Sequence, residues 1–395
     1  MELKALEKKT IINTYNRQPE ATLLLQRGEG AYVWDDAGKR YLDFVSGLAV
    51  NNLGHCHPQI VEAIYKQAQQ LMHTSNLYYT EPQIRLAEQL VQHSCADKVF
   101  FCNSGAEANE AAFKLARKYG KLKKGEAAFE IITAKRSFHG RTLATVTATG
   151  QPKYHKGFEP LVAGFRYAEF NNLQSFKDAV TAQTCAILIE PVQGEGGVYP
   201  ATLEFLQGLR QLCDKHQLLL IFDEVQCGMG RTGKLFAYQH YGVEPDVFTL
   251  AKALGGGLPI GVMAAKGEAA TTLVPGEHAS TFGGNPVVCA AANVAVSILA
   301  EADFLNRVAE LGAYFQQKLQ ALAYPHLVEV RGLGLMIGLE IAGDAARVVP
   351  LCQEKGLLVN CIGGKTLRFL PPLIVTEKEI DAAVTILEQT LTAID

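Results

Sequence analysis

Residues 218–233 read LLLIFDEVQCGMGRTG, an apolar run that ends at Asp223 and Glu224 and continues into a glycine-rich turn. A fully apolar run of this length is typical of a strand buried on both faces, as in a parallel sheet covered by helices. Ligands bind beyond the carboxyl ends of the strands in such sheets. Asp223 is therefore placed to meet a cationic group of a ligand, or else only to cap the turn that follows it.

Similar apolar runs alternate with helical patterns from about residue 80 to residue 260. The predicted strands are Lys98–Cys102, Ala128–Thr133, Ala186–Glu190, Leu218–Asp223, Asp246–Leu250 and Gly261–Ala265. The helical patterns that fall between some of them are Glu107–Gly120, Leu203–His216 and Leu235–Tyr241. This alternation predicts an α/β fold with a mainly parallel sheet that helices cover on both faces.

The two ends of the chain have a different pattern. Residues 31–44, AYVWDDAGKRYLDF, alternate apolar and polar around a turn, as in a β-hairpin. The last hundred residues mix helices with short strands and end in a helix from Glu377. We therefore expect an N-terminal segment with the hairpin (1–50), a large domain (51–285) and a C-terminal segment (286–395). The hairpin and the C-terminal segment together form a smaller α+β domain.

Composition narrows the classes of function. The chain has 395 residues, of which 48% are hydrophobic, and a formal net charge of -3. This near-neutral charge gives no electrostatic reason to expect nucleic acid or an anionic membrane as a partner. Nine cysteines without a CxxC pair, and a charged N-terminus unlike a signal peptide, favour a cytoplasmic protein. The sequence GHCHP at 54–58 is typical of a turn, so no metal site is expected.

Two further motifs offer a nucleophile and an anion site. Lys252 follows an apolar strand and precedes three glycines in AKALGGGLPIG, residues 251–261. A lysine desolvated in this way can act as a nucleophile, although a lone lysine is more often solvated. Residues 100–117, FFCNSGAEANEAAFKLAR, pass from a strand to a helix through Ser104 and Gly105. The NH groups at that helix start can bind a phosphate or can simply be capped. Neither GxGxxG nor the P-loop pattern occurs.

Other segments offer groups that could recognise a ring or a carboxylate. In SFHGRT, residues 137–142, Phe138 and His139 can present a flat face to a ring, and Arg141 can hold a carboxylate. HASTFGGNP, residues 278–286, adds two hydroxyl groups. Arg368 lies within an apolar strand and needs a partner when it is buried. Glu195, in EPVQGEGG (190–197), is a candidate partner, or else a solvated loop residue.

A phosphate cradle, a ring-facing aromatic residue, an aspartate at a strand end and a nucleophilic lysine are the parts of a site for pyridoxal 5'-phosphate (PLP). In these motifs the sequence resembles the class III aminotransferases of fold type I. The likeness extends from SGLAVNNLGHCHP at residues 46–58 to LRFLPPL at 367–373. It implies that Lys252 binds PLP covalently and moves the reacting proton, and that Asp223 pairs with the ring nitrogen. The other residues implied in cofactor binding are Ser104, Gly105, Ala106, Phe138, Val225, Gln226 and Thr281.

The same resemblance implies the substrates. It suggests transfer of the δ-amino group of N2-acetylornithine to 2-oxoglutarate in arginine biosynthesis. Arg141 and Ser280 would contact the acylated substrate, and Arg368 would bind the α-carboxylate of glutamate. Glu195 would pair with Arg368 when no carboxylate is there and swing away when one is. In the family, the position of Thr281 reaches the phosphate of the other subunit, which implies a homodimer with shared active sites.

Several alternatives stay open at the level of sequence. A related transaminase could act on succinylornithine, ornithine, 4-aminobutyrate or succinyl-diaminopimelate, because one acyl group differs little from another in a roomy pocket. An aminomutase of the same fold would be an isomerase, but two arginines and a glutamate favour two carboxylate substrates taken in turn. A non-catalytic binding protein of this fold would be expected to lack Lys252 or Asp223, and both are present.

Overall fold

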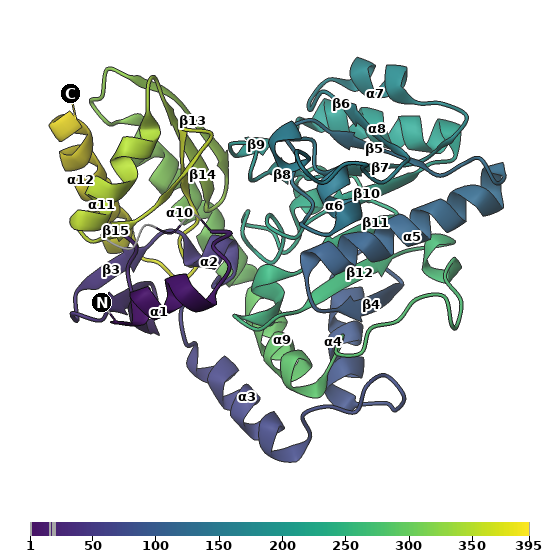
Figure 1. The fold of residues 1–395 in the computed structure, drawn as a ribbon, viewed down its shortest axis with the longest axis horizontal. Helices are drawn as coiled ribbons and strands as arrows, with labels where there is room; N and C mark the ends of the chain where they lie inside the picture. The colour runs from purple at the N-terminus through teal and green to yellow at the C-terminus, as the bar shows by residue number, and fades with distance from the viewer. Residues whose placement is uncertain (1, 16, 18–20, 395) are drawn as a thin grey trace.

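The computed structural model describes residues 2–15, 17 and 21–394, and it places them in two parts of unequal size (Figure 1). The larger part contains a seven-stranded sheet with the order β4-β12-β11-β10-β7-β5-β6. Its strands are β4 (Lys98–Cys102), β5 (Glu130–Ala134), β6 (Phe165–Ala168), β7 (Thr184–Ile189), β10 (Leu219–Asp223), β11 (Val247–Leu250) and β12 (Gly261–Ala265). The α/β class predicted from the sequence is confirmed.

The sheet is mainly parallel, with one reversed strand. β10 lies at its centre and pairs in parallel with β11 on one side and with β7 on the other. β12 is antiparallel to both of its neighbours, β11 and β4. The carboxyl ends of β10 and β11 therefore lie side by side at one edge, where Asp223 ends one strand and Lys252 follows the other.

Helices cover both faces of this sheet. The central strand β10 suits this burial, because all of its residues before the final aspartate are apolar. Leu219 and Ile221 point to the face covered by α5 (Gly105–Lys124), where they join a cluster rich in alanine. Leu220 and Phe222 point to the opposite face, where α8 (Leu203–His216) contributes to a larger core. This alternation of side chains across the strand buries both faces.

The smaller part joins the two ends of the chain, as predicted. The hairpin of β2 (Tyr32–Asp35) and β3 (Arg40–Asp43) pairs in parallel with β15 (Leu357–Leu358). β1 (Leu25–Glu29) completes this sheet. A second sheet has the order β13-β14-β17-β16. Its elements and the helices beside it are β13 (Leu327–Leu333), β14 (Met336–Ile341), β16 (Asn360–Ile362), β17 (Thr366–Phe369), α10 (Ala302–Gln320), α11 (Val348–Glu354) and α12 (Glu377–Ile394).

Two expectations about the elements are wrong. Leu235–Tyr241 is not a regular helix and contains only a short 3-10 turn at Ala237–His240; the NH groups of Ala237 and Tyr238 at its start donate to the buried carboxylate of Glu224. The expected boundary at residue 285 separates helices that pack together. α9 (Pro286–Leu299) lies against α3 (Pro58–Gln70) and α4 (Glu81–Gln92) of the larger part.

Within the described residues, no single helix is long and apolar enough to cross a membrane. α9 and α10 reach that length only when they are taken together, across a bend of 70°.

Candidate active site

A cavity of about 390 Å³ lies beyond the carboxyl ends of β10 and β11, at the start of α5. Asp223 and Lys252 both line it, together with Glu190 and Glu195 from the segment that follows β7. Asp223 ends β10, and Lys252 and Glu190 follow the neighbouring strands β11 and β7, all three of which are buried in the larger part. The sequence therefore places charged side chains where a parallel sheet binds its ligands.

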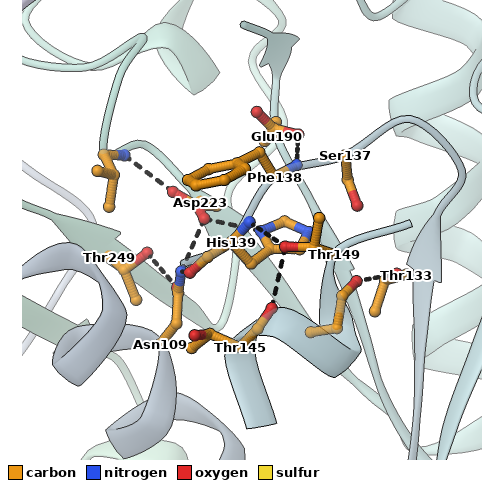
Figure 2. A network of polar contacts seen from close by, with 12 residues as sticks. Asn109, Thr133, Ser137, Phe138, His139, Thr145, Thr149, Glu190, Asp223 and Thr249 are labelled. Carbon is orange, nitrogen blue, oxygen red and sulfur yellow. Dashed lines mark hydrogen bonds and ion pairs between the residues drawn. The ribbon is translucent and has the colours of Figure 1, made fainter. Parts of the chain in front are cut away.

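Asp223 is buried and fixed by three hydrogen bonds (Figure 2). Its Oδ2 accepts from Nδ2 of Asn109 and lies 2.8 Å from Nδ1 of His139, while its Oδ1 accepts from the NH of Val225 at 3.0 Å. Asp223 therefore does cap the turn that follows it, through the NH of Val225. Three donors around one carboxylate also fix its orientation, which suits a group that pairs with a ligand cation.

His139 lies deeper than the sequence suggested. It was expected to present a flat face to a ring; it lines the cavity, but it is 2% exposed and lies beside Asp223, and its Nε2 atom has no partner among the described residues. Its backbone NH donates to Oγ1 of Thr149, and its carbonyl accepts from Asn109 (Figure 2).

Asn109 is a residue of this site that the sequence analysis missed. It lies on the buried face of α5 among alanines, and its side chain donates to Asp223 and to the carbonyl of His139. Its Oδ1 accepts from Oγ1 of Thr249 on β11 (Figure 2). The sequence signal that could have identified it is a polar residue on the alanine-rich face of a predicted helix, because a buried polar side chain needs hydrogen-bond partners.

Lys252 begins a 3-10 turn directly after β11 and has a φ angle of +47°. Such a positive φ is uncommon for a residue with a side chain and is found disproportionately at functional sites. Burial lowers the pKa of its amine, an effect that Glu195 partly opposes. A lysine with a lowered pKa has a larger fraction of free amine, the form that acts as nucleophile and base.

The start of α5 has the features of an anion site. Ser104 caps the helix, and its hydroxyl accepts from the NH of Glu107 at 3.2 Å. The NH groups of the first turn have no partner within the helix, and those of Gly105 and Ala106 belong to that turn. A Cβ atom on Gly105 would lie 2.8 Å from Cγ1 of Val225, so only glycine allows this close approach.

Arg368 is completely buried on β17 and reaches the residues that line the cavity from the smaller part. Its Nη1 donates to Oε1 of Glu195 at 2.6 Å and to the side-chain oxygen of Gln226 at 3.2 Å. Its Nη2 has no partner among the described residues. Burial alone would raise the pKa of Glu195, but the Arg368 guanidinium holds it below its ordinary value. The expected Glu195–Arg368 pair is present, with one donor left for a ligand.

A third carboxylate of the cavity, Glu190, was not singled out from the sequence. Burial, together with the nearby charge of Asp223, raises its pKa well above the ordinary value of a glutamate. The NH groups of Phe138 and Gly194 donate to its two oxygens, at 3.1 and 3.3 Å. They fix the carboxyl group beside Phe138, which also lines the cavity as expected.

Four of the expected residues do not line this cavity; one of them, Arg368, contacts its lining through Glu195 and Gln226. Arg141 is exposed, with its guanidinium 4.1 Å from the centre of the Tyr154 ring. Ser280 accepts a hydrogen bond from Asn103, close to the start of α5, but does not line the cavity. Thr281 is exposed. The structure thus brings together the expected cofactor residues except Thr281, and it leaves the substrate residues Arg141, Ser280 and Arg368 outside the cavity lining.

The architecture and the site together are those of an aminotransferase. A family model for class-III aminotransferases matches residues 14–391. The chain belongs to this family, whose members are PLP-dependent transaminases.

Relatives and solved structures agree with this assignment. Curated acetylornithine aminotransferases from Caldanaerobacter subterraneus and Methanocaldococcus jannaschii are each 54% identical to this chain, with 98% of both chains covered. The structure is similar to that of ornithine aminotransferase from Toxoplasma gondii (TM-score 0.94, 32% identity, 100% and 95% covered). It is also similar to that of N-acetylornithine aminotransferase from Stenotrophomonas maltophilia (TM-score 0.85, 38% identity, 99% and 98% covered).

The residues of the cavity fit PLP. The start of α5 offers NH donors and a glycine for the phosphate, Asp223 offers an oriented carboxylate for the ring nitrogen, and Lys252 offers an amine of lowered pKa for the aldehyde carbon. Val225 and Phe138 line the same cavity as apolar walls for the ring. This donor set matches the three functional groups of the cofactor.

Proposed function

We propose that this enzyme transfers the δ-amino group of N2-acetylornithine to 2-oxoglutarate, giving N-acetylglutamate 5-semialdehyde and glutamate in arginine biosynthesis. The observation that carries the proposal is the buried Arg368, which pairs with Glu195 and keeps one free donor. An arginine that alternates between an internal glutamate and a substrate carboxylate suits two substrates that differ in their number of carboxylates. Relatives named for acetylornithine, 54% identical to this chain, support the choice of amino donor.

The chain's own residues divide the chemical work. When bound, PLP supplies an electron sink for the pair of electrons left at the substrate carbon after proton loss. Asp223, oriented by Asn109 and His139, would hold the proton on the ring nitrogen. The amine of Lys252 would hold the cofactor and then take and return the substrate proton, because its lowered pKa keeps part of it uncharged.

Glu195 and Arg368 would sort the two substrates. Acetylornithine has one carboxylate, which Arg141 would bind near the opening, so Arg368 keeps its pair with Glu195. 2-Oxoglutarate has two, and its α-carboxylate would displace Glu195 and use the unpartnered Nη2 of Arg368. Leaving Arg368 unpaired in a buried position would be unfavourable in either half of the cycle, and this exchange avoids it.

We further propose a cytoplasmic homodimer in which each site is completed by the partner. Thr281 is exposed, as expected of a residue that serves the phosphate of another subunit. Leu77, Tyr78 and Tyr79 are 80%, 70% and 94% exposed. Adjacent large apolar side chains exposed to this degree are typical of a protein interface. In the dimer, residues 75–79 and 46–50 would contact the acyl group, and Val50 already lines the cavity.

A substrate panel tests the amino donor. The PLP-loaded protein would receive acetylornithine, succinylornithine, ornithine, 4-aminobutyrate or succinyl-diaminopimelate without 2-oxoglutarate, and the change in visible absorbance of the cofactor would be followed. We expect acetylornithine to react much faster than ornithine. The opposite order would leave the family and the cofactor in place but refute the proposed substrate, and the similarity to ornithine aminotransferases makes ornithine the alternative to test first.

Glu195→Gln tests the division between the two half-reactions. The neutral amide still accepts a hydrogen bond from Arg368 but no longer neutralises its charge. We expect the variant to favour the glutamate half-reaction over the acetylornithine half-reaction, because the substrate carboxylate no longer competes with a charged glutamate. Equal effects on both half-reactions would refute the exchange.

A further inference from the structure

Arg231 is a completely buried arginine outside the cavity. It forms no ion pair with a carboxylate of the described residues, and burial lowers the pKa of its guanidinium to about 9. A buried charge without a counter-ion is costly unless neutral oxygens solvate it. The groups that solvate Arg231 therefore indicate what this side chain does.

These groups come from three distant segments of the chain. Nη1 of Arg231 donates to the carbonyl of Leu335 at 3.0 Å and to the carbonyl of Pro371 at 2.5 Å, and Nη2 donates to Oδ1 of Asn52. The backbone carbonyl of Arg231 also accepts from the NH of Leu335 at 3.1 Å. Leu335 lies between β13 and β14 of the smaller part, and Pro371 follows β17. We call these four residues the Arg231 junction.

The Arg231 junction connects the two parts of the molecule next to the active site. Arg231 ends the turn that begins at Asp223, and Pro371 lies three residues after Arg368. Asn52 extends the connection, because its Nδ2 donates to the carbonyl of Met229 and its own carbonyl accepts from the NH of Leu373. The segment that follows Arg368 is thus bonded at Pro371 to Arg231 and at Leu373 to Asn52, which is itself bonded to Met229 in the turn after β10.

We propose that Arg231 is a positioning residue that sets the guanidinium of Arg368 relative to Asp223 and Lys252, and thereby determines the affinity for dicarboxylates. The planar guanidinium donates to these oxygens from two separate nitrogens, whereas a lysine ammonium has its three donors on a single atom. Lysine would keep the charge but lose the simultaneous contacts, so β17 would no longer be fixed against the larger part. The inference rests on the proposed function in one respect, the binding of the α-carboxylate by Arg368.

Ligand binding to the PLP-loaded protein, measured by calorimetry, tests the proposal. Glutarate is an unreactive dicarboxylate, and N2-acetylnorvaline has the acyl group and single carboxylate of the amino donor without its amine. We expect Arg231→Lys to raise the Kd of glutarate by about tenfold, the loss expected for a displaced charged hydrogen bond. The Kd of N2-acetylnorvaline and the visible absorbance of the cofactor should stay unchanged.

Arg210→Lys is the matched control. Arg210 is partly buried and also donates to more than one oxygen, but it joins α8 to Asp246 and to the carbonyl of Glu244 within the larger part. It should change neither Kd. If Arg231→Lys weakens both ligands equally, or leaves glutarate unaffected, Arg231 has only a general structural role and the proposal is wrong.

Two further variants keep the outcome decisive. Asn52→Ala removes one of the three acceptors, so it should give the same split with a smaller shift even if Arg231→Lys does not fold; equal effects on both ligands would overturn the proposal.

Arg368→Gln separates the role proposed for Arg368 from the role inferred for Arg231. If it does not weaken glutarate, the proposed role of Arg368 fails, and the role inferred for Arg231 fails with it. If it does, while Arg231→Lys has no effect on glutarate, only the inference about Arg231 fails.

Discussion

At the scale of single residues, the side chain of His139 orients Asp223 through one atom, Nδ1. The amide nitrogen of asparagine lies at a similar distance from the backbone as Nδ1, whereas that of glutamine lies closer to the position of Nε2. We therefore expect His139→Asn to keep kcat/KM within about fivefold, and His139→Gln to lower it by roughly ten- to a hundredfold, as expected for a lost hydrogen bond to a charged group.

This pair of variants separates hydrogen bonding from packing. Glutamine fills more of the buried space than asparagine, so a pure packing role predicts the opposite order of activity. Unfolding midpoints of both variants should be measured beside kcat/KM. Equal losses of activity in the two variants would contradict the role assigned to Nδ1.

The charged ends of buried strands were the residues that the sequence could predict. Asp223 and Lys252 each follow an apolar run, and the geometry of a parallel sheet brings such positions together. The positions of His139 and Asn109 could not be predicted in this way. Whether His139 faces a ring or lies behind a carboxylate depends on how the segment after β5 crosses α5, which no local pattern specifies.

At the scale of elements, α5 packs closely on the sheet through Gly120. A Cβ atom there would lie 2.4 Å from Cβ of Cys185 and 2.6 Å from the carbonyl of Ala128. Alanine is the better helix former by about 1 kcal/mol, but overpacking against backbone costs about 1–3 kcal/mol. Since the nearest atoms here cannot move aside, we expect Gly120→Ala to lower the free energy of unfolding by about 2 kcal/mol in chemical denaturation.

Gly208 on α8 provides the control for this substitution. The three atoms nearest to its added Cβ all belong to the side chain of Leu173, with Cδ2 at 2.3 Å, and a flexible leucine can rotate away. Gly208→Ala should therefore be closer to neutral, within about 1 kcal/mol. If Gly208→Ala lowers the free energy of unfolding more than Gly120→Ala does, the rigidity of the neighbouring atoms does not determine the effect of the added methyl group.

Elements with one dominant pattern were predictable, and those defined by tertiary contacts were not. β4, β12 and α8 have the predicted bounds because an apolar run or stripe identifies each of them. Residues 235–241 also have a helical pattern, but they form only a short 3-10 turn, whose first two NH groups donate to the buried Glu224. β6 at the sheet edge is half-exposed, so its sequence lacks the continuous apolar run of the central strands.

At the scale of the whole molecule, each chain holds most of a site but not Thr281. This residue is exposed and outside the cavity, beside Ser280 and an exposed Phe282. The proposed dimer gives these side chains a partner and buries the apolar residues at 77–79. If the site is divided between subunits, two variants that are each defective should restore activity when they form a mixed dimer.

Mixed dimers test this division. Thr281→Ala alone should weaken cofactor binding, and Lys252→Ala alone should abolish transamination. Co-expression with two affinity tags yields a heterodimer in which one site combines Lys252 of one subunit with Thr281 of the other, both intact. We expect that heterodimer to regain activity at a limiting PLP concentration at which the Thr281→Ala homodimer has little. If Thr281 instead served the site of its own chain, every site of the heterodimer would lack either Lys252 or Thr281. Its activity at limiting PLP would then not exceed that of the Thr281→Ala homodimer, and the proposed division of the site would be wrong.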